Sequence, residues 1–260
     1  MASNKILLKN KLFLSNIFNH KFMRLFGLII FSFIFFNSCE TEDGIQIEIH
    51  FRQFVNQNQL ELHNMIYENE ASNLYSVEKL SYVISDLTLY FQNGESMFLD
   101  DYYFIDLNNQ NSLEIKNIDI PSLCVSVSFT YGFSQNHNVT DAYLNDPNNF
   151  HNLMLWPTTL GGGYHYMKLE GEYLDNYGEQ KFYNTHTGGL YGNDYSMSYL
   201  FDFDASENQS KIYIDMNINN IYNDPIYDFN YYGSAIMSSE EAQSVIQVNM
   251  MEDVFSVSEN

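Results

Sequence analysis

Alternation of apolar and polar residues is the feature that most constrains the fold of this 260-residue chain. In its clearest run, every second residue from Ile45 to Phe51 is apolar, and the residues between them, from Gln46 to Arg52, are polar. A period of two is typical of a strand with one buried and one exposed face. Comparable runs predict strands over residues 79–91, 102–107, 112–120, 124–133, 163–174, 179–186, 196–204, 210–218 and 244–250.

The segments between these runs are rich in Asn, Asp and Gly, and only residues 238–247 fit a short turn or helix. The share of aromatic residues, 17%, also favours pleated, half-buried surfaces. Strands without helical spacers predict an all-β protein, an antiparallel β-sandwich with long loops, rather than alternating strand–helix units. We expect residues 45–260 to form one such domain.

The N-terminal 38 residues contain five basic residues and no acidic ones. Arg24 precedes twelve uncharged, mostly apolar residues, which are too few to span a bilayer and are typical of a signal-peptide core. The segment ends in FNSC, at Cys39, which resembles a bacterial lipobox. We therefore expect residues 1–38 to be removed as a signal peptide and Cys39 to carry a lipid. A start at Met23, and a transmembrane anchor with an unmodified Cys39, are the alternatives.

From Cys39 onwards the chain holds 33 acidic and six basic residues, a net charge of −27. Residues 39–44 form an acidic tether, and an acidic tract directly after the lipid-bearing Cys resembles the surface-export signal of Bacteroidetes-type lipoproteins. This predicts an outer-membrane lipoprotein, exposed at the cell surface, that contacts the membrane only through its lipid. The charge also excludes nucleic acid as a partner, because phosphate binding needs clustered Lys and Arg.

Sequence motifs for catalysis are missing: there is no Gly-x-Ser-x-Gly, His-Glu-x-x-His or glycine-rich phosphate loop. We therefore expect no enzyme activity. Cys124 is the only cysteine besides Cys39, so the chain has no disulfide framework and no CxxC metal motif. Alternation places Cys124 on the face opposite Val125 and Val127, where we expect a structural role.

The most unusual stretch, WPTTLGGGYHYMKLEGEYL, starts at Trp156, the only tryptophan. Three consecutive glycines (Gly161, Gly162 and Gly163) precede a predicted strand that contains His165. Glycine permits unusual backbone dihedrals and close approach, so we expect this loop to fold over the start of that strand. A second histidine beside glycines, His186 in NTHTGGL, is expected to project into the same pocket.

The order of these motifs resembles the MbnP-like copper-binding proteins, a family associated with methanobactin and with copper-repressible surface proteins. The specific part is MLW at residues 154–156, GYHYMKLEG at 163–171 and HTG at 186–188. Supporting matches are the strand at residues 80–89, FID at 104–106 and FTYG at 129–132. The resemblance covers about residues 45 to 255.

The resemblance implies a protein that binds copper for acquisition or buffering. In this family copper is bound through histidine and a tryptophan that a haem-containing oxidase converts to kynurenine, whose aryl amine and carbonyl can act as ligands. By residue match, Trp156 is the first of two family tryptophans and His186 is the late histidine, whereas Thr158 replaces the second tryptophan. The early Phe-x-His is replaced by FRQ at 51–53, with His50 nearby. We therefore take His186, His165 and His50 as candidate copper ligands.

Each candidate also has a structural explanation. Trp156 can be a core or rim aromatic, His186 can satisfy a turn, His165 can be a buried residue on the face of Met167, and His50 can be an exposed strand residue. The alternative function is surface adhesion or glycan binding by a β-sandwich lipoprotein without a metal, in which aromatic side chains form a stacking platform.

Overall fold

The computed structural model describes residues 44–146 and 148–259, and the chain from Gly44 onwards forms one compact unit. Its strands are β1 (Ile45–Val55), β2 (Asn58–Gln59), β3 (Tyr67–Glu68), β4 (Leu74–Tyr75), β5 (Lys79–Phe91), β6 (Ser96–Asp106), β7 (Glu114–Ile120), β8 (Cys124–Tyr131), β9 (His165–Leu174), β10 (Gln180–Gly188), β11 (Met197–Asp202), β12 (Lys211–Asn217) and β13 (Phe255–Glu259). Its helices are α2 (Phe150–Met154), α3 (Phe229–Tyr232) and α4 (Glu240–Met250), with short 3-10 turns η1 (Gln110–Leu113), η2 (Thr158–Leu160), η3 (Asn219–Tyr222) and η4 (Ile236–Ser238). No helix within this range is long and apolar enough to cross a bilayer. The expectations for the signal peptide and for Cys39 concern residues outside it.

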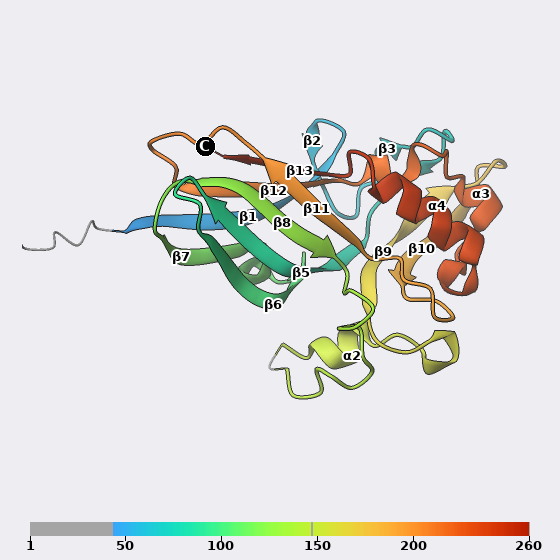
Figure 1. The fold of residues 1–260 in the computed structure, drawn as a ribbon. Helices are drawn as coiled ribbons and strands as arrows, with labels where there is room; N and C mark the ends of the chain where they lie inside the picture. Colours follow the sequence, from blue (N-terminus) through green and yellow to red (C-terminus); the bar gives the residue numbers. More distant parts are fainter. Residues whose placement is uncertain (1–43, 147, 260) are drawn as a thin grey trace, which may run out of the picture. The chain divides into compact units, whose positions relative to one another are not determined.

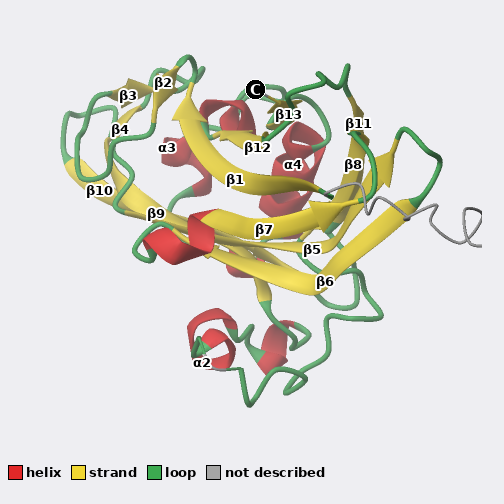
Figure 2. Ribbon diagram, turned by 90° about the vertical axis from the view of Figure 1, so that its left-hand side faces the viewer, coloured by secondary structure: helices red, strands yellow, loops and turns green. Residues whose placement is uncertain are grey.

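The strands form two sheets, with β1 and β7 of one lying over β5 and β6 of the other (Figure 2). The first sheet has the order β13-β12-β1-β2, with β7 also paired to β1. The second has the order β11-β8-β5-β9-β4-β3, with β6 paired to β5 and β10 to β9. The predicted all-β sandwich is confirmed. Among the named strands of the described residues, only β1 and β12 pair in parallel, in register from Glu48 opposite Lys211 to Phe54 opposite Asn217.

The core lies between the two sheets and is rich in aromatic rings. Phe255 of β13 packs against Tyr82, Phe129 and Tyr131 of the other sheet, with ring centroids 6.3, 5.4 and 6.1 Å away. Gln53 is buried in this layer, and its amide donates a hydrogen bond of 3.0 Å to the Tyr82 hydroxyl. This hydrogen bond gives the buried Gln53 amide nitrogen and the Tyr82 hydroxyl a partner across the two sheets.

The strand predicted for residues 244–250 is wrong, because these residues belong to helix α4. The helix begins after Ser239, whose hydroxyl accepts a hydrogen bond of 3.2 Å from the Ala242 N–H. Its buried residues include Ala242, Ile246 and Met250, which are spaced by four and so lie on one helical face. Residues four apart also fall on one face of a strand, so a run of only seven residues does not distinguish the helix from the predicted strand.

Cys124 is buried and its thiol is free, as expected for a structural cysteine. Burial raises the pKa of this thiol to about 11. The register between β5 and β8 shifts between Tyr90 and Phe91. The shift lets Cys124 join Val127 in the core, whereas alternation alone places the two on opposite faces.

Residues between β8 and β9, including α2, form a lobe beneath the second sheet (Figures 1 and 2). An aromatic cluster attaches the lobe to β6. Tyr102 of β6 packs against Tyr143 and Phe150 with ring centroids 4.6 and 4.7 Å away, and Phe150 stacks on Tyr164 at 5.1 Å. This lobe carries the loop that begins at Trp156 and holds it against the β9–β10 hairpin.

Candidate metal centre

A β-bulge sets the direction of the His165 side chain. In the β9–β10 hairpin, Gly188 lies opposite His165 and not opposite Tyr166, the position that continuous pairing from His186 requires. Opposite residues share a face of the sheet, so the bulge moves His165 to the face of His186 and Gly188. This corrects the expectation that His165 lies on the core face with Met167.

The loop from Trp156 to Gly163 closes on itself before β9 begins. The Trp156 N–H donates to the Gly163 carbonyl at 2.9 Å, and the Gly162 N–H donates to the Pro157 carbonyl at 3.1 Å. Gly161, Gly162 and Gly163 have φ values of 130°, 74° and 84°, in the region that side chains disfavour. The three glycines therefore supply the turn that returns the chain to the start of β9.

Two of these glycines also touch the preceding loop. A Cβ atom on Gly163 would lie 2.5 Å from Asn138 Oδ1 and 2.9 Å from the Asn138 carbonyl oxygen. In place of that contact, Asn138 Oδ1 accepts a hydrogen bond of 2.7 Å from the Tyr164 N–H, and Thr140 Oγ1 accepts one of 2.7 Å from the Gly163 N–H. The glycines thus give close backbone approach as well as unusual dihedrals.

The closed loop places the Trp156 ring against His165, and His165 against His186. The ring centroids of Trp156 and His165 lie 4.7 Å apart, and those of His165 and His186 lie 5.2 Å apart, both edge to face. Trp156 is fully buried. Its ring covers Gly188, where a Cβ atom would lie only 2.8 Å from Trp156 Cε3. The structure therefore brings three of the sequence-predicted residues into one cluster, with His165 at its centre.

His165 is neutral and presents an unused nitrogen lone pair. Its Nδ1 lies 3.0 Å from the Met154 carbonyl oxygen, which can only accept, so Nδ1 carries the proton. Burial, with His186 nearby, lowers the pKa of the His165 imidazole to about 3. The lone pair then lies on Nε2, which is buried without a hydrogen-bond partner, as is the indole Nε1 of Trp156. Buried polar atoms are rarely left unpaired, so both point to a missing partner or a functional role.

Glu170 orients the second imidazole. Its Oε1 lies 3.0 Å from His186 Nε2 and 3.7 Å from Lys79 Nζ. The hydrogen bond to His186, and then the charge of Lys79, lower the pKa of Glu170 to about 2 against the opposing effect of burial. An ionised carboxylate only accepts, so His186 Nε2 carries a proton, and in the neutral imidazole Nδ1 is then the nitrogen with the lone pair. Metal-binding histidines commonly have such a carboxylate on the other ring nitrogen.

Helix α4 contributes a further contact to β10, the strand that carries His186. Gln243 is buried, and its Nε2 donates to the His186 carbonyl oxygen at 2.8 Å. Sequence reasoning did not find Gln243 or Glu170 as site residues. Glu170 does lie within the KLEG block that carries the family resemblance, which was the one available signal.

His50, the third predicted ligand, lies elsewhere. It is on β1 in the other sheet, where its Nε2 contacts Glu48 at 2.8 Å and its ring lies 5.7 Å from that of Tyr213. The structure therefore does not bring it to Trp156, His165 and His186. Within residues 44–146 and 148–259, no three His, Cys, Asp or Glu side chains are grouped as a metal site would require.

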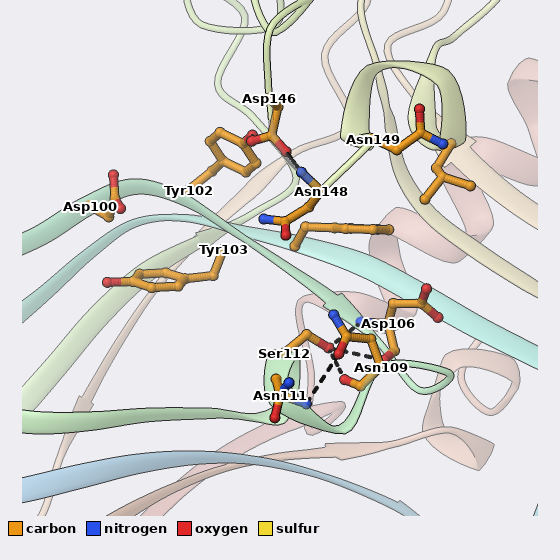
Figure 3. Close-up of a pocket in the computed structure, with 12 residues that line it drawn as sticks. Asp100, Tyr102, Tyr103, Asp106, Asn109, Asn111, Ser112, Asp146, Asn148 and Asn149 are labelled. Atoms are coloured by element: carbon orange, nitrogen blue, oxygen red, sulfur yellow. Dashed lines mark hydrogen bonds between the residues drawn. The ribbon is translucent and has the colours of Figure 1, made fainter.

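The cluster lies apart from four open cavities in the described part of the chain. One cavity of about 730 Å³ lies beside β6, between Tyr102 and Asp146 on one side and Asn109 and Ser112 on the other (Figure 3). None of the three clustered residues lines it. The cluster is a buried site at the base of a hairpin and not part of this cleft.

Comparison with known proteins agrees with the fold and with the motif order. The family model of MbnP matches residues 44–238, a range that includes the cluster and ends before α4. Among solved structures, the chain is similar to MbnP from Methylosinus trichosporium, with a TM-score of 0.56 and 9% identity over 82% of this chain and 98% of that one. At this identity the likeness shows the fold alone. No curated protein matches the sequence.

Proposed function

The chain belongs to the MbnP family, and on that premise we propose that it is a cell-envelope lipoprotein that binds copper for acquisition or buffering. It acts as a binding protein and not as an enzyme. The observation that carries the proposal is the buried, neutral His165, whose unpartnered Nε2 lies beside a second imidazole.

His165 and His186 are the residues that hold the metal in this proposal. Imidazole nitrogen suits copper, and both histidines have one nitrogen held by an oxygen acceptor and the other free to coordinate. Ring centroids 5.2 Å apart are compatible with two imidazole nitrogens that each lie about 2 Å from one metal. Structural Zn²⁺ takes four ligands and Ca²⁺ takes six or more oxygens, so a pair of imidazoles favours copper over either.

Trp156 lies at the edge of this site. If a haem-containing oxidase converts it to kynurenine, the new aryl amine and carbonyl arise in direct contact with the His165 ring, where the donor set is short of ligands. The indole is fully buried, so the loop from Trp156 to Gly163 has to open before a partner enzyme reaches it.

Copper loading of the purified full chain tests the proposal. The protein is loaded with Cu(I) under reducing conditions and with Cu(II) in air, desalted, and analysed for bound metal. Trp156 is the only tryptophan, so quenching of its fluorescence reports binding at the cluster. We expect about one copper per chain, and His165→Ala and His186→Ala each to weaken binding by at least about tenfold.

His63→Ala is the matched control, because the His63 side chain is 67% exposed and pairs with Glu78 on the surface. It should retain copper and quenching like the unaltered chain. If the His165→Ala/His186→Ala double variant stays folded and binds copper as tightly as the His63→Ala variant, the cluster is structural and the proposal is wrong.

A further inference from the structure

The far end of the β9–β10 hairpin carries two strongly exposed aromatic rings. Tyr177 in the turn is 92% exposed and Phe182 on β10 is 68% exposed. Only one other phenylalanine within the described ranges, Phe98, has a ring more than half exposed. Single exposed apolar residues are common on protein surfaces, but these two rings line the same cleft.

These rings border a cleft of about 710 Å³ between the hairpin and α3. Its other walls are mostly amide and hydroxyl side chains, among them Asn176, Gln180 and Ser234. The volume is within the range of small-molecule sites, roughly 300–1,000 Å³. Amide groups both donate and accept hydrogen bonds, and aromatic faces cover apolar C–H surface.

The cleft is held rigidly. Asp175 Oδ1 accepts hydrogen bonds of 2.9 Å from the N–H groups of Tyr177 and Glu179, which fixes the hairpin turn. Asn230 Oδ1 of α3 accepts one of 3.2 Å from the Asn176 N–H, which fixes the turn to the opposite wall. The exposed rings are therefore presented by an ordered element and not by a free loop, as binding sites require.

Charge narrows the class of ligand. Lys181, the one cation of the lining, lies 2.6 Å from Glu179 and 3.8 Å from Asp175, so its charge is already compensated. The chain as a whole carries a net charge of −22. An anionic ligand is therefore repelled, and the neutral amide and hydroxyl groups of the walls suit a neutral polar ligand.

We propose that this cleft binds a neutral saccharide, with Tyr177 and Phe182 stacking on sugar faces and the amide groups binding hydroxyls. A sugar presents apolar C–H faces and a rim of hydroxyls, which matches aromatic rings flanked by amides. The tip of the hairpin lies at the end of the domain opposite the start of β1 (Figures 1 and 2). The site is separate from the copper cluster and does not depend on it.

The test is binding of four neutral oligosaccharides, namely maltohexaose, cellohexaose, xylohexaose and mannohexaose, to the purified full chain by titration calorimetry. We expect at least one to bind with a Kd of about 1 mM or tighter, and Tyr177→Ala and Phe182→Ala each to weaken it about tenfold. Phe98→Ala is the matched control, since its ring is 54% exposed on β6, and it should bind normally. Copper content should be the same in all variants.

Three results would overturn the proposal. The first is that none of the four sugars binds at about 10 mM, a concentration that detects even weak sites. The second is that Phe182→Ala and Phe98→Ala have the same effect on binding. The third is that Phe182→Ala turns a self-associated chain into a monomer while sugars have no effect, which would make the aromatic rings a contact between copies.

Discussion

The protonation state of one residue, His165, links the candidate site to stability. Its pKa is about 3 in the folded chain and about 6.5 in an unfolded one. Between these values the unfolded chain binds a proton that the folded chain does not. The free energy of unfolding is therefore unaffected by the protonation of His165 above about pH 6.5. It falls as the pH drops from there towards 3, by at most about 1.4 kcal/mol per pH unit.

We therefore expect the free energy of unfolding to fall between about pH 7 and pH 5 by more in the unaltered chain than in the His165→Gln variant. Denaturant titrations at both pH values measure the difference, and the histidines that do not contact His165 cancel because both proteins contain them unchanged. Glu170 stays ionised over this range, since its pKa is lowered to about 2. Equal losses in the two proteins would show that His165 is not held neutral by burial.

At the scale of elements, the glycine loop and the bulge show what the sequence could and could not predict. Alternation located β9 and the unusual glycines located the loop, because both signals are local. The side of β9 on which His165 lies was not predictable, since the bulge depends on pairing with Gly188 in another strand. The separation of His50 from this cluster was not predictable either, because which sheet a strand joins is set by long-range contacts.

The glycine loop yields a prediction at this scale. Gly163→Ala places a Cβ 2.5 Å from Asn138 Oδ1 in a backbone region that alanine disfavours. Gly94→Ala is the matched control, because Gly94 has a similar φ of 87° and nothing within 4 Å of its Cβ. We expect a cost of about 1 kcal/mol for Gly94→Ala and about 2–4 kcal/mol for Gly163→Ala, measured by thermal unfolding. Equal costs would mean that the loop needs glycine only for its dihedrals.

At the scale of the whole molecule, the charge of the chain changes at the same point where the predicted signal peptide ends. The segment before Cys39 is basic and the rest is strongly acidic, so removal of the first 38 residues changes the net charge from −22 to −27. We expect Cys39→Ala to accumulate as an unprocessed precursor that does not incorporate labelled palmitate in bacterial cells. A Ser38→Ala variant keeps a small residue before the cysteine and should mature normally. Normal maturation and labelling of the Cys39→Ala protein would contradict lipidation at this residue.

The β9–β10 hairpin carries His165 and His186 near one end and Tyr177 near the other, joined by continuous pairing from Gln180 to Thr187. The same two-stranded hairpin thus reaches both proposed sites. Any coupling between the two sites must be reciprocal. If a saccharide bound in the cleft changes the affinity for copper by some factor, copper changes the affinity for the saccharide by the same factor. If the two proposed sites affect each other at all, the effect can pass along this one hairpin and needs no second domain.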